Sequence, residues 1–141
     1  MKKNIFLILI FSILTDIGII YAFNISPHRH HLNVSPGKTY TVSFQIVNVY
    51  DYKISIEPSF YNKKMPEQNY DINLDKWIKI KPKKFILKPK QTKKVTVKIS
   101  VPRQILKKSV VMISFPIENL EQKNSPVQLV VSVPVYINVK E

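Results

Sequence analysis

The chain has 141 residues, with 22 lysines and arginines against 9 aspartates and glutamates, a formal net charge of +13, and no cysteine. This length is that of one domain rather than two. The lack of cysteine excludes disulfide crosslinks and lipid attachment to a cysteine, so the stability of the fold must come from a packed core. Outside the first 22 residues no stretch keeps a helical period, which favours an all-β fold.

The first residues have the layout of a secretory signal peptide. Two lysines precede an apolar run from Ile5 to Leu14, and small and apolar residues follow. The alternative is a retained membrane anchor, because the apolar stretch is nearly long enough to span a bilayer. Asp16 favours the signal peptide, since a centred aspartate costs about 2.5–3.5 kcal/mol on insertion scales. We expect a signal helix at 1–22 and a secreted domain at 23–141, in the periplasm or outside the cell.

Cleavage of the signal predicts where the secreted protein begins. Because Ala22 ends the apolar stretch, the native protein is expected to start at or near Phe23. The intact mass of the purified native protein measures this directly. A membrane-embedded species that retains Met1 would contradict cleavage.

Runs of alternating apolar and polar residues predict strands with one buried and one exposed face. Residues 61–76 break this pattern; they are polar, contain Pro66, and are expected to form a long surface loop. Seven runs lie in chain order at Leu32–Val34, Thr39–Val49, Tyr52–Phe60, Ile78–Lys81, Val95–Val101, Ser109–Ile117 and Val127–Val139.

Seven strands at this spacing predict a single antiparallel immunoglobulin-like sandwich. The alternative is a small closed barrel. Gly37 is the only glycine after the predicted signal, and tight barrel corners usually need more, which favours the sandwich. A Pro36–Gly37 turn ends the first run, and a tight turn is expected around Asn48–Asp51.

A basic tract runs from Lys76 to Ile117 without an acidic residue, and it holds ten lysines between Lys76 and Lys98. Such lysines either protect strand edges from aggregation or bind phosphate or sugar polymers or lipid head groups. Nucleic acid is the obvious partner of a basic chain, but the predicted signal peptide argues against it. The candidate anion-binding residues are Lys79, Lys81, Lys83, Lys84, Lys88, Lys90, Lys93 and Lys94.

Three histidines lie close together at His28, His30 and His31. They are candidate metal ligands, but structural zinc takes four ligands and no cysteine is present, so an exposed polar turn is the favoured interpretation. No glycine-flanked serine or paired carboxylates appear in the chain. We therefore expect no catalytic residue, no metal, no cofactor and no enzymatic activity.

The last predicted strand also has a second face with apolar residues. Val130, Pro134 and Tyr136 share that face, and Val110 and Met112 lie on the corresponding face of the run before it. If the two strands pair, part of the outer surface is apolar, which marks either a partner site or a surface covered by another segment.

Several short motifs resemble a known family. They are the Pro36–Gly37 turn before a strand ending in Asn48, Trp77 at the start of a short strand, Phe85–Pro89 (FxLxP), and the PVYI sequence at Pro134–Ile137. In this order they resemble the immunoglobulin-like N-terminal domain of the PapD-like periplasmic pilus chaperones and, more loosely, major sperm protein domains. The resemblance covers most of the chain after the signal.

The resemblance implies a site on the last strand. In these chaperones alternating apolar residues of that strand complete the open sheet of a pilus subunit, and an arginine and a lysine hold the subunit's carboxylate. Arg29 matches the arginine, and Val127, Leu129 and Val131 match the apolar run. The lysine and the chaperones' second domain have no counterpart here.

The sequence therefore predicts a secreted, non-enzymatic, protein-binding module. Its expected role is chaperone-like or adaptor-like, in the assembly of a surface component such as pili, with a surface or pilus subunit as the partner. The alternative is a basic adhesion module that binds anionic envelope polymers or lipid head groups through the lysines of the basic tract.

Overall fold

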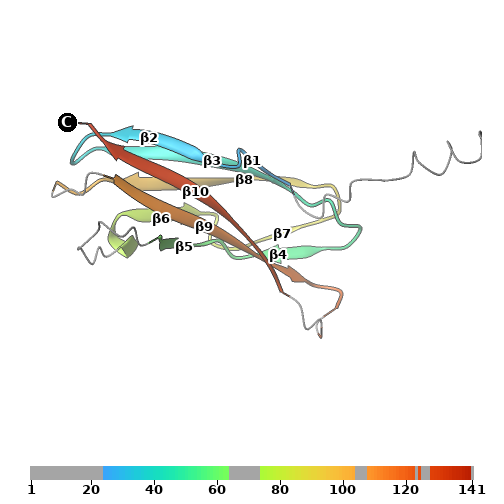
Figure 1. Cartoon of the computed structure of the whole chain (residues 1–141). Coiled ribbons are helices and arrows are strands. Elements are labelled where there is room, and N and C mark those ends of the chain that lie inside the picture. The colour runs from blue at the N-terminus through green and yellow to red at the C-terminus, as the bar shows by residue number, and fades with distance from the viewer. Residues whose placement is uncertain (1–23, 64–73, 104–107, 123, 125–127, 141) are drawn as a thin grey trace, which may run out of the picture.

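Two β-sheets pack face to face in the computed structural model, which describes residues 24–63, 74–103, 108–122, 124 and 128–140 (Figure 1). Sheet A has the strand order β1-β3-β8-β6, and sheet B has the order β2-β10-β9-β4-β7, with β5 also paired to β9. The elements are β1 (Asn24–Ser26), β2 (His30–Val34), β3 (Thr39–Val47), β4 (Ile54–Ile56), β5 (Ser59–Asn62), the 3-10 turn η1 (Leu74–Lys76), β6 (Ile78–Lys81), β7 (Phe85–Leu87), β8 (Thr92–Ser100), β9 (Lys108–Asn119) and β10 (Leu129–Val139).

The core lies between the two sheets and follows the alternation of the sequence. On β8, Val95, Val97 and Ile99 are buried, while Lys98 between them is exposed. Phe44 of sheet A meets Phe115 of sheet B edge to face, with ring centroids 5.9 Å apart, and both rings are fully buried. This arrangement confirms the all-β sandwich that the sequence predicts.

The predicted number of seven strands is wrong, because the described part of the chain holds ten. One expected run, Tyr52–Phe60, is divided where a proline interrupts the ladder, since proline has no N–H to donate. Two further short strands, β1 and β7, lie outside all seven expected runs, and a proline separates each of them from a neighbouring strand. Pro27 separates β1 from β2, Pro58 separates β4 from β5, and Pro82 ends β6 before β7. The loop expected at residues 61–76 is also shorter, because Tyr61 and Asn62 belong to β5 and Leu74–Lys76 form η1, while residues 64–73 lie outside the described ranges.

The sandwich is not wholly antiparallel. The chain passes from sheet A to sheet B between β1 and β2, so that β1 pairs with β3 whereas β2 pairs with β10. The pairing of β2 with β10 is parallel, and every other described pairing is antiparallel. The chain also passes from sheet A to sheet B between β6 and β7, and each of these short strands lies at an edge of its sheet.

Asn48 forms hydrogen bonds to three segments at one end of the sandwich: the loop after β3, the end of β7 and the residue before β8. The sequence predicted a tight turn at this position. Its side chain is fully buried; Nδ2 donates to the carbonyl oxygens of Tyr52 (2.8 Å) and Leu87 (3.1 Å), and Oδ1 accepts from the Tyr50 amide (3.0 Å). The Asn48 amide also donates to the Gln91 carbonyl at 3.0 Å. Burial and, to a smaller extent, charge repulsion from the neighbouring Tyr52 phenol raise the pKa of the Tyr50 phenol above its ordinary value.

The predicted signal helix at residues 1–22 lies outside the described residues. No helix in the described ranges has both the length and the hydropathy needed to cross a membrane. Cleavage near Phe23 therefore stays a prediction.

Candidate functional site

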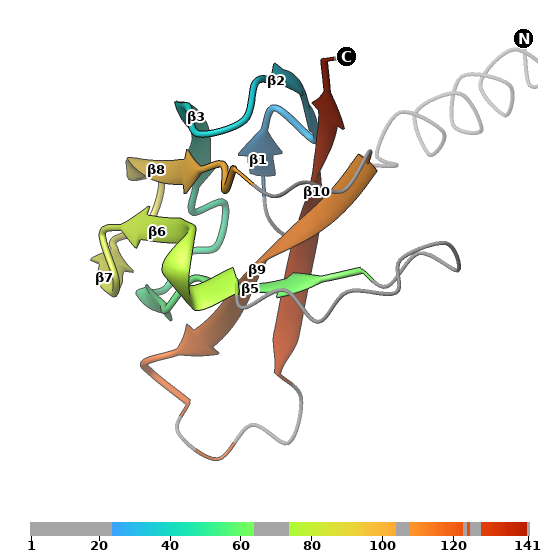
Figure 2. The ribbon, with the colours of Figure 1, turned by 90° about the vertical axis from the view of Figure 1, so that its left-hand side faces the viewer.

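The N-terminal half of β10 has a strand on one side only. β10 pairs with β9 from Leu129 to Asn138, but it pairs with β2 only from Val135 onward. Along Leu129–Pro134 no described strand therefore lies on the side opposite β9, and we call this side the free edge of β10. Figure 2 shows this half of β10 extending away from β2, which lies beside its C-terminal half.

The alternation of the ladder decides which backbone groups face the free edge. The Lys140 amide donates to the Val34 carbonyl on the β2 side at 2.9 Å. Because backbone groups of a strand point alternately to the two sides, the even-numbered residues of β10 face away from β9. The free edge therefore presents the N–H and C=O groups of Val130 and Ser132, and the C=O of Pro134.

The side chains along this half become more exposed toward its start. Val133 is buried, Val131 is half-buried against the core, and Leu129 and Val130 are 40% and 51% exposed. The strand thus leaves the sandwich gradually, and its first residues combine an apolar surface with free backbone groups. Val127, the first of the three apolar residues predicted from the resemblance, lies outside the described residues.

Arg29 is exposed and directly precedes β2. The parallel register places His30 opposite Val135, so extending it by one residue places Arg29 level with Pro134. The structure thus brings Arg29 to the C-terminal limit of the free edge. A role for Arg29 in binding a carboxylate stays a prediction. β10 itself has no basic residue from Leu129 to Val139, and Lys140 directly follows the strand.

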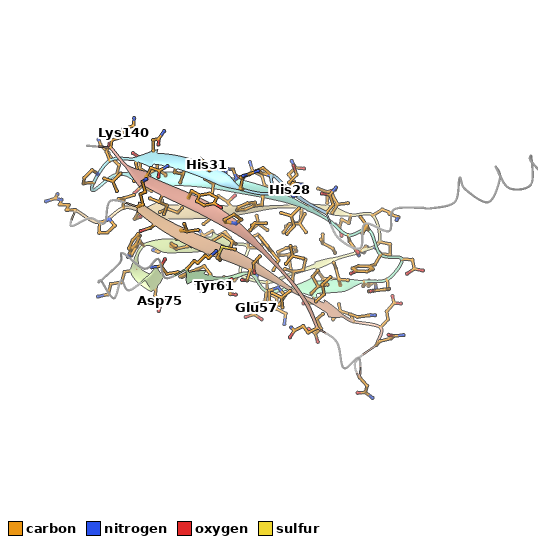
Figure 3. All side chains as sticks on the ribbon, viewed as in Figure 1. His28, His31, Glu57, Tyr61, Asp75 and Lys140 are labelled. Carbon is orange, nitrogen blue, oxygen red and sulfur yellow. The ribbon has the colours of Figure 1, made fainter. Side chains whose placement is uncertain are left out.

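The three histidines do not converge. His30 Nε2 lies 3.0 Å from the Ser43 carbonyl oxygen and its ring meets Phe44 edge to face, whereas His31 stacks on Tyr136 with centroids 4.7 Å apart. Figure 3 shows His28, in the segment before β2, at a separate point from His31 on β2. No group of three or more His, Cys, Asp and Glu side chains in the described ranges is arranged to hold a metal ion.

The predicted apolar face of β9 and β10 is present but interrupted. The register places Val110 opposite Tyr136 and Met112 opposite Pro134. Val110 is buried, and the ring of His31 covers Tyr136. The hydroxyls of Ser114 and Ser132, which are 2.9 Å apart, separate this region from the exposed Val130. The face is therefore not one continuous apolar patch.

The candidate anion-binding lysines are distributed over several surfaces. Lys79, Lys81 and Lys94 lie on the outer face of sheet A, where the register adds Lys98. Lys98 is not among the candidate residues predicted from the sequence, because its neighbour across the sheet depends on strand register. Lys83, Lys84, Lys88 and Lys90 lie in the segments flanking β7, and Lys93 is at the start of β8 opposite Ile46.

Two lysines of this set have partners of their own. Lys84 pairs with Glu57 at 3.8 Å, and Lys90 Nζ donates to the Val49 carbonyl at 3.1 Å. The eight lysines therefore do not form a single anion-binding face.

The fold has clear counterparts among solved structures, although no known protein family and no curated protein matches the sequence. The ASH/PapD-like domain of human CEP192 matches with a TM-score of 0.63 and 14% identity, over 85% of this chain and 86% of that chain. The CsuC–CsuE chaperone–tip adhesion subunit pre-assembly complex from the Csu pili of Acinetobacter baumannii matches at 0.60 and 16%, over 84% of this chain and 57% of that chain. WR4, a C. elegans member of the MSP family, matches with a TM-score of 0.50 and 13% identity, over 84% of this chain and 98% of that chain.

These likenesses concern the fold. At 13–16% identity they establish shared architecture and no shared activity. The chain also spans little more than half the length of the Csu pilus structure that it matches, 57%. The chain thus has the PapD-like sandwich fold that its motifs indicated, and the solved structures that share this fold include a pilus chaperone complex and an MSP protein.

Proposed function

We propose that this protein is a non-enzymatic, chaperone-like or adaptor-like binding module that completes the sheet of a partner protein through the free edge of β10. The observation that carries the proposal is the unpaired side of Leu129–Pro134, where exposed apolar side chains accompany free backbone groups. An exposed apolar edge strand is a ready template for another strand. In such pairing the main-chain hydrogen bonds provide affinity and the alternating side chains provide register.

The geometry favours one orientation of the partner strand. β2 is parallel to β10. A partner strand on the same side of β10, paired with Leu129–Pro134, would continue that parallel arrangement along the free edge. A parallel strand would run from Leu129 toward Pro134 and end beside Arg29. A terminal carboxylate at that point would meet the guanidinium group, which binds carboxylates through two parallel N–H···O bonds.

The fold neighbours support a protein partner. The Csu structure is a chaperone complex with a tip adhesion subunit, which makes a surface or pilus subunit in the periplasm or at the cell exterior the favoured partner class. The adhesion alternative has weaker support, because the lysines that it needs are distributed over several surfaces.

A peptide-binding measurement tests the proposal. The probe is a fluorescein-labelled eight-residue peptide of alternating valine and threonine with a free C-terminal carboxylate, followed by fluorescence anisotropy. Leu129→Glu places a charge among the apolar contacts of the edge and is expected to weaken binding at least about 100-fold, whereas Arg29→Ala is expected to weaken it about tenfold. Amidation of the peptide's C-terminus should weaken its binding to the parent protein by the same factor of about ten. It should not weaken binding to the Arg29→Ala variant any further.

Ile86→Glu is the matched control. Ile86 is 56% exposed on β7, at the opposite edge of sheet B, and its replacement should leave peptide binding unchanged. The Leu129→Glu protein must also melt cooperatively near the temperature of the parent. If it unfolds, Leu129 is an ordinary core residue, and binding of the peptide by a folded Leu129→Glu protein would equally contradict the proposal.

A further inference from the structure

A second free strand edge lies on the other sheet. β6 pairs with β8, and no other described strand pairs with it. The Trp77 carbonyl accepts a hydrogen bond from the Ser100 amide of the β8 side at 2.7 Å. By the alternation of the ladder, Ile78 and Ile80 therefore point their N–H and C=O groups away from β8. We call this side the free edge of β6.

Two lysines beside this edge face each other across the ladder. Lys79 of β6 is directly opposite Lys98 of β8, and both side chains are exposed on the outer face of sheet A. Like charges in directly opposite positions destabilise a sheet. The other described outward positions on these two strands and on β3 are lysine, threonine, serine, glutamine or the C-terminal valine of β3, so this face supplies no carboxylate to neutralise the pair.

A cleft opens next to the same edge. It has a volume of about 700 Å³, and its apolar lining comes from Pro58 and Phe60 on one side and from Ile78 and Ile80 of β6 on the other. Of its two acidic residues, Glu57 pairs with Lys84 at 3.8 Å. In Figure 3, Glu57, Tyr61 and Asp75 lie along the side of the molecule on which β5 and β6 run.

We propose that the free edge of β6 is a second strand-addition site, which accepts an extended protein segment of alternating acidic and apolar residues. Residues two apart in a strand lie about 6.4–6.8 Å from each other, so alternate carboxylates of an added strand match the spacing of Lys79 and Lys81. The alternate apolar side chains would point to the inner side, into the cleft beside Ile78 and Ile80. The backbone of the segment would bond to the free groups of the same two isoleucines.

These features favour a strand over a soluble polyanion. A polyanion would use the lysines but neither the free amide and carbonyl groups nor the apolar cleft. The proposal does not depend on the free edge of β10, because the two edges belong to different sheets. The competing explanation is that the lysines only protect an edge strand from aggregation, in which case no strand binds.

The test uses a fluorescein-labelled ten-residue peptide of alternating glutamate and valine, again by fluorescence anisotropy. A peptide of the same composition with the glutamates and valines in two blocks is expected to bind at least about tenfold more weakly. Reversing both edge lysines, in Lys79→Glu/Lys81→Glu, should weaken binding of the alternating peptide at least about tenfold, because two favourable cross-strand pairs become repulsive. Lys53→Glu/Lys140→Glu is the matched control, with the same net charge and both sites exposed, and its affinity should stay within about twofold of the parent.

A charge swap makes the test specific. A peptide of alternating lysine and valine should bind the doubly reversed variant and not the parent. Methylation of the amides along one side of the glutamate–valine peptide should abolish binding, because that side forms the ladder with β6. The Leu129→Glu protein should bind the peptide as the parent does, which separates this edge from the edge of β10.

Three results would overturn the proposal. One is equal binding of the alternating and block peptides. Another is an equal loss in both pairs of lysine variants, with sodium polyphosphate competing as well as the peptide, which would assign the lysines to non-specific polyanion binding. The third is the absence of any peptide binding, which would leave the lysines as edge protection only.

Discussion

Val97→Asp is expected to lower the free energy of unfolding by about 4 kcal/mol or more, enough to unfold a marginally stable domain. Val97 is fully buried in the middle of β8, so the new carboxylate would have neither water nor a partner. Lys98→Asp changes the next residue of the same strand, which is exposed, and is expected to cost less than about 0.5 kcal/mol. It would also replace the like-charge pair with Lys79 by an opposite-charge pair, so the variant is expected to melt at or slightly above the temperature of the parent.

Thermal and urea unfolding of the two variants measure the difference. The two substitutions introduce the same residue at neighbouring positions. Loss of a valine lowers strand propensity more than loss of a lysine, but that scale spans only about 1 kcal/mol, so burial is the main variable. Equal losses at both positions would mean that the two faces of β8 are wrongly assigned.

Asn48→Ala is expected to lower the free energy of unfolding by about 3–5 kcal/mol. The substitution removes three hydrogen bonds at a fully buried site and leaves the carbonyl oxygens of Tyr52 and Leu87 without their donor. An unsatisfied buried polar group costs about 1–3 kcal/mol. Three groups lose their partner: the Leu87 carbonyl at a buried bond, and the Tyr52 carbonyl and the Tyr50 amide at partly buried bonds. The loss should appear as a lower urea midpoint with an unchanged slope, because the surface exposed on unfolding stays the same.

Asn119→Ala is the control for this prediction. The Asn119 Oδ1 accepts bonds from the Glu121 (2.8 Å) and Gln122 (3.2 Å) amides, but these bonds are exposed, so water replaces them when the side chain is removed. We expect a loss of about 1 kcal/mol or less. Similar losses for the two asparagines would mean that Asn48 does not hold the β3–β4 loop, β7 and the start of β8 together.

The two proposed binding edges have opposite chemical characters on one sandwich. The edge of β10 is apolar and ends at a single arginine, whereas the edge of β6 is flanked by lysines and an apolar cleft. Each edge would therefore select a different strand, one by a terminal carboxylate and the other by alternating acidic side chains. Because they lie on different sheets, both can be occupied at once.

The sequence by itself determined the fold class and the faces of the long strands. The alternation of apolar and polar residues over β3, β8, β9 and β10 identified which side chains face the core, because a strand places successive side chains on opposite sides. The same pattern singled out Leu129 and Val131 as an apolar series on the last strand. Their surroundings did not follow from it.

Only the tertiary structure decided which strands are neighbours. A period of two residues assigns a face to each side chain but contains no information on the strand beside it or on the register with that strand. The free edge of β10 exists because β2 begins its pairing at Val135, and the opposition of Lys79 and Lys98 exists because β6 pairs with β8 in one particular register. Short strands such as β1 and β7 were missed for the same reason, since three residues hold too few repeats for a pattern and gain their structure from the strands with which they pair.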